Sequence, residues 1–386
     1  MDFSLTKEQE LLRDGLTKFL STRYGLESSR AAAKTGAGRQ PEIWAGFADE
    51  LGILGATLPE EDGGLGGGPV ELMIVTEALG YALVVEPFVE TVVIGSGLLR
   101  RAGGDRAAKI VRDIVAGTAI TAFAATEPTS GHTYSDVATT ARRDGDGWVI
   151  NGAKTVVTSA PLANHLLVTA RTSGSQRDSD GISLFVVDID PNELPAGVES
   201  HAYRTIDDRQ AADLTFTDLR LPADALLGAE GGAWPSIDKA VDEATAAVAS
   251  EAVGLMRKVL ADTVEYAKQR RQFGQPIGGF QALQHRMVDM YMEVEQSIAA
   301  VYLAVLNLEA DPVERSLAVS AAKATIGRSA RFIGQNAVQL HGGMGMTEEL
   351  AIGHYFKRLT AIEYEFGPAD QHIARYATLS ASRTSA

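Results

Sequence analysis

The chain has 386 residues, a net charge of −15 and no cysteine. The acidic balance argues against a nucleic-acid partner, because binding to phosphates requires a basic surface. The absence of cysteine excludes disulfides, thiolate catalysis and cysteine-bound metals; no metal site is expected, and a reducing cytoplasm is the expected location.

Residues 1–119 are expected to form an N-terminal α-helical domain. Thr6 and Gln9 have the spacing of a capping box, and apolar residues then recur at helical spacing. The glycine-rich run at residues 59–68 is interpreted as a plain connection and not as a phosphate-binding loop, because acidic residues lie within it and no strand precedes it.

The most apolar stretch of the chain lies at residues 70–99. Four glutamates interrupt it, and Pro87 would break or kink a helix through its middle. We therefore interpret this stretch as two buried helices, and no membrane span is expected.

Residues 120–228 are expected to form a middle antiparallel β domain. Short runs rich in β-branched residues alternate there with turn residues, as is typical of strands. The dipeptide Asn151-Gly152 predicts a tight hairpin turn between strands at residues 149–150 and 155–158.

Residues 229–386 are expected to form a C-terminal helical domain. Long helical patterns cover residues 244–270, 280–308 and 313–340, and long antiparallel helices with apolar stripes indicate a four-helix bundle. The fold class is therefore α+β and multi-domain. Helices and strands do not alternate, which argues against a Rossmann fold.

Several motifs, in this order, are similar to those of the acyl-CoA dehydrogenase family over nearly the whole chain. The motifs lie at residues 125–128, 135–136, 148–154, 219–228, 266–277 and 339–346. Each is weak alone, but their shared order is specific. The resemblance implies a flavoprotein that binds FAD and removes two hydrogens from an acyl-CoA thioester in lipid catabolism. It also implies electron-transfer flavoprotein, or an equivalent acceptor, as a partner.

The resemblance also implies roles for single residues. Thr126, Ser135 and Thr158 would lie at the flavin ring and the thioester. Arg270 would pair with the FAD pyrophosphate, since a guanidinium can hold phosphate oxygens with two hydrogen bonds.

The remaining expected contacts belong to the adenine end of FAD and to assembly. Phe273 and Gln281 would line the adenine end. The loop with Gln339 and Gly343 would approach the FAD of a neighbouring subunit, because glycine backbone can lie close to a cofactor. A homo- or hetero-oligomer is therefore expected.

The chain departs from the family pattern at three places. The segment at residues 129–134 is longer than usual, Val156 stands where many members have tryptophan, and Thr245 stands where arginine is usual. These departures suggest an actinobacterial-type member of a hetero-oligomeric subgroup. A branched, cyclic or steroid-derived acyl group is the corresponding guess for the substrate.

The family reaction requires a base that removes the α-proton, commonly a glutamate near the C-terminus. An alignment with a gap makes Glu365 this base, whereas a count without gaps places Gly367 there. Other members carry the base on an earlier helix, where the expected position is Ala244, next to Glu243. We favour Glu243 and keep Glu365 as the alternative.

Two other functions remain open at this point. The chain could be a non-catalytic or FAD-sharing partner subunit of a heteromeric acyl-CoA dehydrogenase. It could also be a flavin oxidase or monooxygenase on the same fold, because a fold does not determine a function.

Overall fold

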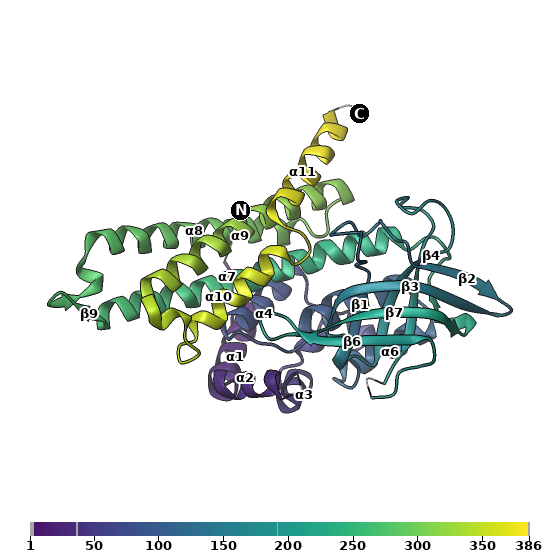
Figure 1. The fold of residues 1–386 in the computed structure, drawn as a ribbon, viewed down its shortest axis with the longest axis horizontal. Coiled ribbons are helices and arrows are strands. Elements are labelled where there is room, and N and C mark those ends of the chain that lie inside the picture. Colours follow the sequence, from purple (N-terminus) through teal and green to yellow (C-terminus); the bar gives the residue numbers. More distant parts are fainter. Residues whose placement is uncertain (1–3, 36–37, 191, 385–386) are drawn as a thin grey trace. The chain divides into compact units, whose positions relative to one another are not determined.

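The computed structural model describes residues 4–35, 38–190 and 192–384, and Figure 1 shows its ribbon. The chain separates into two compact units. The bundle unit holds residues 1–28, 68–84 and 245–386, and the sheet unit holds residues 29–67 and 85–244. The elements follow the expected order of helices, then strands, then helices. The three-domain boundaries at 119/120 and 228/229 stay a prediction.

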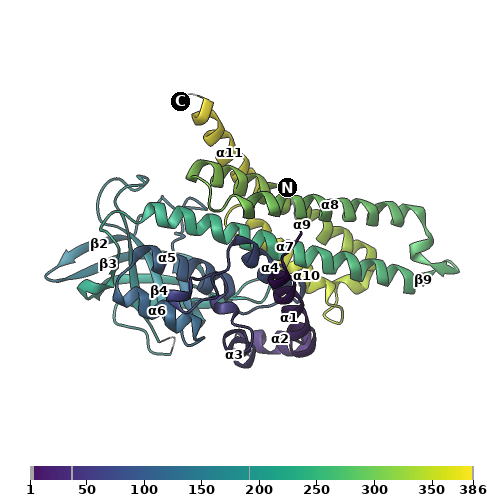
Figure 2. The same ribbon diagram turned by 180° about the vertical axis from the view of Figure 1, so that it is seen from behind.

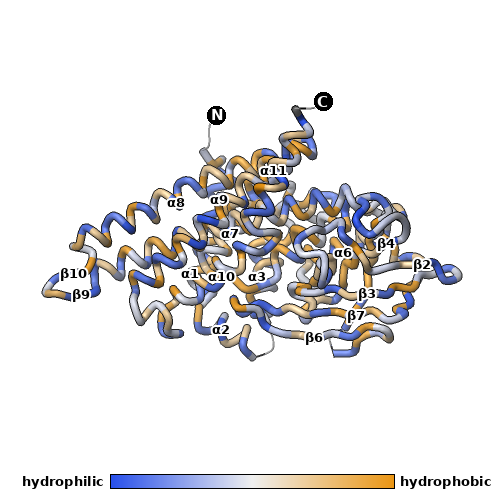
Figure 3. Tube along the Cα trace, turned by 45° about the horizontal axis from the view of Figure 1, so that its top comes forward, coloured by the Kyte–Doolittle hydropathy of each residue, from blue (hydrophilic) through white to orange (hydrophobic). Residues whose placement is uncertain are grey.

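Long helices dominate the bundle unit. They are α7 (Trp234–Gln269), α8 (Gln281–Leu306) and α9 (Pro312–His341). Their bounds lie close to those expected from the sequence, except that α7 begins ten residues before the expected residue 244. The other helices that lie within the unit or begin in it are α1 (Lys7–Arg23), α2 (Leu26–Lys34), α4 (Pro69–Tyr81), α10 (Ile352–Tyr364) and α11 (Ala369–Thr384). Figure 3 shows that hydrophobic and hydrophilic residues alternate along α8.

Side chains cap the starts of α1 and α9. At the start of α1, Thr6 and Gln9 form the expected capping box, with each side chain bonded to the other residue's backbone N–H. At the start of α9, Asp311 accepts hydrogen bonds from the N–H groups of Val313 and Glu314. These bonds satisfy donors that the first turn of a helix leaves without partners.

Helices α4 and α7 meet through glycines. A Cβ on Gly80 would collide with the backbone of Glu251, and a Cβ on Gly254 would collide with the backbone of Glu77. The two backbones therefore touch at a point where no side chain fits, and glycine is required there because of this close approach.

One large sheet forms the core of the sheet unit. Its strands are β1 (Thr121–Ala124), β2 (Thr140–Asp144), β3 (Gly147–Thr158), β4 (His165–Arg171), β5 (Ile182–Asp188), β6 (Val198–Arg204), β7 (Gln210–Leu221) and β8 (Leu226–Leu227). Their order is β6-β7-β3-β2-β4-β5-β8, with β1 beside β4. Apolar side chains of β4 and β5 are buried on both faces.

The sheet is mixed, which corrects the expectation of a purely antiparallel one. Most neighbours are antiparallel, but β1 pairs with β4 in parallel register. Parallel neighbours need a long crossover connection. Residues 125–164 supply it, since they contain the whole β2–β3 hairpin and return the chain to the end at which β1 starts.

The expected turn at Asn151-Gly152 was wrong. Strand β3 continues through both residues, and the turn that joins β2 to β3 lies at residues 144–147, where Gly145 has φ 59°. Gly152 instead lies at a bulge with φ 151°, where a Cβ would collide with Thr139. The close approach of Thr139 explains the glycine without any turn.

The apolar stretch at residues 70–99 forms two helical segments, as expected. The first is α4, and the second is the π-helical turn η3 (Val89–Gly95), which continues into α5 (Ser96–Ala102). Within the sheet unit η3 packs against β1, where Thr91 Oγ1 donates to the carbonyl of Thr121. Figure 2 shows α5, the helix that follows η3. No helix in the described part of the chain is long and apolar enough to cross a membrane.

Two further helices belong to the sheet unit, α3 (Pro41–Asp49) and α6 (Asp105–Val115). The side chain of Trp44 on α3 donates from Nε1 to the carbonyl of Gly117, which follows α6. This bond satisfies the indole N–H of a buried tryptophan.

Replacement of Gly254 by alanine should destabilise the bundle unit by about 1–3 kcal/mol, the usual cost of overpacking. The methyl group has no free space against the backbone of Glu77. Thermal unfolding measures the change. Gly15→Ala is the matched control, because Gly15 lies inside α1 with open space around it and alanine favours helix there. Equal melting temperatures for Gly254→Ala and the parent protein would contradict the close approach.

Candidate functional site

The residues expected at a cofactor site fall into two groups. Thr126, Ser135 and Thr158 lie in the sheet unit. The other five lie in the bundle unit: Arg270, Phe273, Gln281, Gln339 and Gly343.

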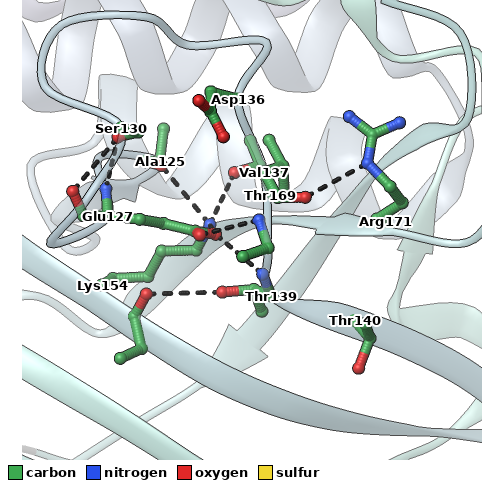
Figure 4. A network of polar contacts seen from close by, with 12 residues as sticks. Ala125, Glu127, Ser130, Asp136, Val137, Thr139, Thr140, Lys154, Thr169 and Arg171 are labelled. Carbon is green, nitrogen blue, oxygen red and sulfur yellow. Dashed lines mark hydrogen bonds and ion pairs between the residues drawn. The ribbon is translucent and has the colours of Figure 1, made fainter. Parts of the chain in front are cut away.

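A buried ion pair between Lys154 and Glu127 lies in the same unit, and Glu127 directly follows Thr126 (Figure 4). Lys154 on β3 is 1% exposed, and its Nζ lies 2.7 Å from Glu127 Oε1. The ammonium also donates to Thr169 Oγ1 and to the carbonyl of Ala125. Burial lowers the pKa of Lys154 to about 8, with Glu127 opposing the shift. Burial raises the pKa of Glu127, but Lys154 and hydrogen bonds outweigh it, so this pKa lies below its usual value.

The carboxylate of Glu127 also closes a loop. Its oxygens accept hydrogen bonds from the backbone N–H groups of Ala138 and Thr139, at 2.8 and 3.0 Å. Residues 127–139, which include the segment that is longer than usual in the family, are therefore held together at their base. Thr126 precedes this loop directly and Ser135 lies within it, so both are held by the same pair.

Arg171 also holds Ser135 in place, by a hydrogen bond to its backbone carbonyl. Its guanidinium donates to six backbone carbonyls, those of Ser135, Val137, Ser173, Gln176, Asp178 and Asp180. The cation thus joins the segment at residues 135–137 to the loop at residues 173–180. Peptide carbonyls accept its hydrogen bonds, and within the described ranges no carboxylate is bonded directly to it.

Thr158 lies in a strained part of β3. Val156 and Ser159 both have positive φ angles, 50° and 66°, although neither is glycine. Such conformations are unfavourable, especially for a β-branched residue, and they concentrate at functional sites. Val156 is also 52% exposed. The side chain that replaces the family's tryptophan therefore points away from the core.

In the second group, a ring stack joins two of the expected motifs. Tyr266, in the last turn of α7, stacks on His341 at 4.3 Å between ring centroids. The exposed Arg270 directly follows α7, and the exposed Gly343 lies in the turn η7 (Gly342–Met346) that follows His341. The stack brings the two motifs to the same end of the bundle unit.

Phe273 lies at the tip of a small hairpin, between β9 (Arg271–Gln272) and β10 (Gln275–Pro276). It is 90% exposed and has φ 51°, an unusual state for a large aromatic residue. Gln281, at the start of α8, and Gln339, near the end of α9, are exposed as well. An open guanidinium, an open aromatic ring and bare glycine backbone fit the phosphates and the adenine of a dinucleotide.

The first candidate base, Glu243, is paired. Its two carboxylate oxygens accept from both terminal nitrogens of Arg101, at 3.0 and 3.1 Å. Arg101 comes from α5, and both side chains are partly buried. A two-bond pair of this kind holds the carboxylate in one orientation.

The second candidate, Glu365, belongs to a network in the bundle unit. Its Oε2 lies 2.9 Å from Arg358, whose guanidinium also holds Glu251 through two hydrogen bonds at 2.7 and 2.8 Å. Nearby, the buried Lys323 donates to the carbonyls of Ile362, Glu363 and Gly367 and so caps the end of α10. Burial lowers the pKa of Lys323 to about 8.

The residue at the usual base position in the count without gaps, Gly367, has φ 110°. A Cβ there would lie 3.0 Å from Gln371 Oε1 and 3.2 Å from His372 Nε2. A glutamate would therefore be strained at this position, and this backbone favours glycine.

Reasoning from the sequence missed three side chains: Arg101, Lys154 and Arg171. Each is a charged residue in an otherwise apolar or motif-rich segment, which is the signal that singles out Lys154 within β3. The partners of Arg101 and Lys154 could not be read from the sequence, because Glu243 and Glu127 lie far from them along the chain. In the part of the chain that the structure describes, no three metal-binding side chains gather.

Comparison with known proteins gives consistent matches along the chain. Models of the acyl-CoA dehydrogenase N-terminal, middle and C-terminal domains match residues 6–118, 122–219 and 231–378. Acyl-CoA dehydrogenase FadE12 of Mycobacterium tuberculosis is 32% identical over 362 residues, which cover 91% of this chain and 90% of that protein.

Two further relatives belong to complexes. The caffeyl-CoA reductase-Etf complex subunit CarC of Acetobacterium woodii is 30% identical over 312 residues, covering 80% of this chain and 81% of that protein. The structure of the ChsE4-ChsE5 complex from Mycobacterium tuberculosis matches with a TM-score of 0.87 and 26% identity, over 99% of both chains.

Removal of one partner of the Glu127–Lys154 pair should be more harmful than removal of both. Glu127→Gln or Lys154→Met leaves a buried charge without its partner, which typically costs about 3–5 kcal/mol. The double variant leaves no charge and should unfold at a higher temperature than the worse single variant. Thermal unfolding and soluble yield measure these effects.

The control for this experiment is Glu230→Gln, which breaks the exposed pair with Arg143 and should change stability by about 1 kcal/mol or less. Strictly additive losses in the double variant would contradict the coupling of Glu127 with Lys154.

Proposed function

Because the chain belongs to the acyl-CoA dehydrogenase family, an oxidoreductase family, we propose that it binds FAD and forms an α,β double bond in an acyl-CoA thioester. The proposal rests mainly on the stack of Tyr266 on His341 at one end of the bundle unit. This stack brings the motif that contains Arg270 close to the glycine turn η7. These are open groups suited to a dinucleotide, held in place by a buried contact.

Each group of residues has a part in holding the cofactor. Arg270 would bind the pyrophosphate, and Phe273 and Gln281 the adenine end, whereas Gln339 and Gly343 would approach the FAD of a neighbouring subunit. Thr126, Ser135 and Thr158 would contact the flavin ring and the thioester. When bound, FAD would supply the acceptor for the hydride that leaves the β-carbon.

We retain Glu243 as the proposed base, which accepts the α-proton at a carboxylate oxygen. Arg101 holds this carboxylate in one orientation, as general-base catalysis requires. Glu365, by contrast, shares Arg358 with Glu251 beside the buried Lys323. We therefore give Glu365 a structural role.

Assembly and electron transfer are proposed from two kinds of observation. Large apolar side chains are exposed on α8: Val288, Tyr291, Met292, Leu303 and Leu306. These exposed apolar side chains favour burial against a second chain, in a homo- or hetero-oligomer.

One relative is a subunit of a complex with Etf, so electron-transfer flavoprotein or an equivalent is the proposed acceptor. A cytoplasmic location remains a prediction.

One observation favours a second candidate function. Both candidate bases are paired with arginine, and a chain with no available base would instead be a partner subunit that completes the site of another chain. The match to the ChsE4-ChsE5 complex is compatible with this alternative.

The cofactor proposal predicts that purified protein is yellow and releases FAD on denaturation, because no covalent bond is expected. Arg270→Ala should weaken FAD binding about tenfold or more, since charge-assisted hydrogen bonds to phosphate are lost. Flavin fluorescence measures the affinity. Arg271→Ala, next to it on β9, is the control for charge. Protein that stays colourless with added FAD would contradict the proposal and favour the partner subunit.

The base proposal predicts that Glu243→Gln keeps FAD but stops its reduction by acyl-CoA. Loss of a general base typically costs about 10²–10⁴-fold in rate. Stopped-flow bleaching of the flavin measures it, with Glu365→Gln as the matched comparison at the same pH and substrate. Loss of bleaching in Glu365→Gln alone would make Glu365 the base.

A further inference from the structure

Strand β3 carries a bulge opposite one residue of β7. Lys154 pairs with Leu214 and Val157 pairs with Ala212, so that Thr155 and Val156 together oppose the single residue Asp213. An extra residue in one strand bends it and re-aims a side chain. Bulges are frequent beside active sites.

The bulge is strained. Val156 has φ 50°, which a β-branched residue adopts only when its surroundings force it. Three residues later Ser159 has φ 66°, and Thr158 lies between these two positions. The segment therefore needs an interaction that favours its unusual backbone over ordinary strand geometry.

Asp213 supplies that interaction. Its Oδ1 accepts from the backbone N–H of Val156 at 2.9 Å and from Thr155 Oγ1 at 2.8 Å. The same oxygen accepts from the hydroxyl of Tyr203 on β6 at 3.0 Å. Hydrogen bonds to the carboxylate, first that of Val156, keep the pKa of Asp213 below its usual value. The group is therefore an anion at neutral pH, and its hydrogen bonds are charge-assisted.

The bulge is also hydrogen-bonded to Thr126. The backbone N–H of Thr155 donates to the carbonyl of Thr126 at 2.9 Å. One bulge thus links Asp213 to Thr126, and it leads directly into Thr158. The two proposed flavin contacts depend on the same strained residues.

We propose that Asp213 is a positioning residue that holds the bulge at Thr155 and Val156 and so sets the backbone that presents Thr126 and Thr158 to the flavin. The inference rests on the proposed function, since it concerns the same cofactor. Asp213 itself need not touch the flavin.

Asp213→Ala should weaken FAD binding roughly tenfold, because the bulge loses the anion that offsets its strain. Asp213→Asn keeps an acceptor oxygen but not the charge. It should lose roughly a third as much FAD affinity as Asp213→Ala. Asp218→Ala is the matched control. Asp218 lies on the same strand β7 and bonds Asn151 at the other bulge of β3, so its loss should leave FAD affinity unchanged.

A second substitution separates positioning from simple loss of charge. Glycine adopts positive φ without strain, so in a Val156→Gly background the bulge no longer needs Asp213. Adding Asp213→Ala to Val156→Gly should then change FAD affinity less than twofold. A tenfold loss in both backgrounds would overturn the positioning role.

A readout that needs no flavin distinguishes failure of this inference from failure of the proposed function. Amide hydrogen exchange across residues 155–158 should become faster in Asp213→Ala and stay unchanged in Asp218→Ala. If the parent protein binds no FAD, the proposed function fails while this exchange comparison still tests the bulge. Unchanged exchange in Asp213→Ala would overturn the inference in either case.

Discussion

The buried pair of Glu127 and Lys154 is the constraint on which the candidate flavin segments depend. A charge left alone in this interior would cost more than most single interactions return, so the two groups must meet. Their meeting closes the loop at residues 127–139 and keeps β3 beside it. Thr126 and the bulge at Thr155 and Val156 take their places from this arrangement. The segments are therefore ordered before any ligand arrives, which lowers the entropy lost on binding.

Features with local causes could be predicted from the sequence. The capping box of Thr6 and Gln9 involves residues three apart, and the three long helices follow from apolar periodicity within each segment. The dipeptide Asn151-Gly152 shows the limit of such reasoning. Glycine there is required by the approach of Thr139 from the neighbouring strand, and no local pattern distinguishes that cause from a turn.

The candidate site likewise contains residues that local sequence motifs identify and residues that depend on distant partners. Arg270, Phe273 and Gly343 belong to continuous motifs, so the sequence was enough to single them out. Arg101, however, gains its meaning only from Glu243, which is 142 residues away along the chain. Such pairs depend on tertiary packing, and residue spacing carries no information about them.

The ion pair with Arg101 is compatible with the proposed role of Glu243 as the base. The reason is the path of the negative charge during proton transfer. When a carboxylate accepts the α-proton, the negative charge passes to the substrate and would then leave it with the hydride that FAD accepts. Arg101 pairs with Glu243, and once Glu243 is protonated the charge of Arg101 would be available to stabilise an anion bound beside it. Arg358 differs, because Glu251 holds it through two hydrogen bonds whatever the state of Glu365. The charge of Arg358 is therefore balanced by Glu251 as well as by Glu365. Among the described residues Arg101 pairs with one carboxylate and Arg358 with two, and this difference favours Glu243 over Glu365 as the base.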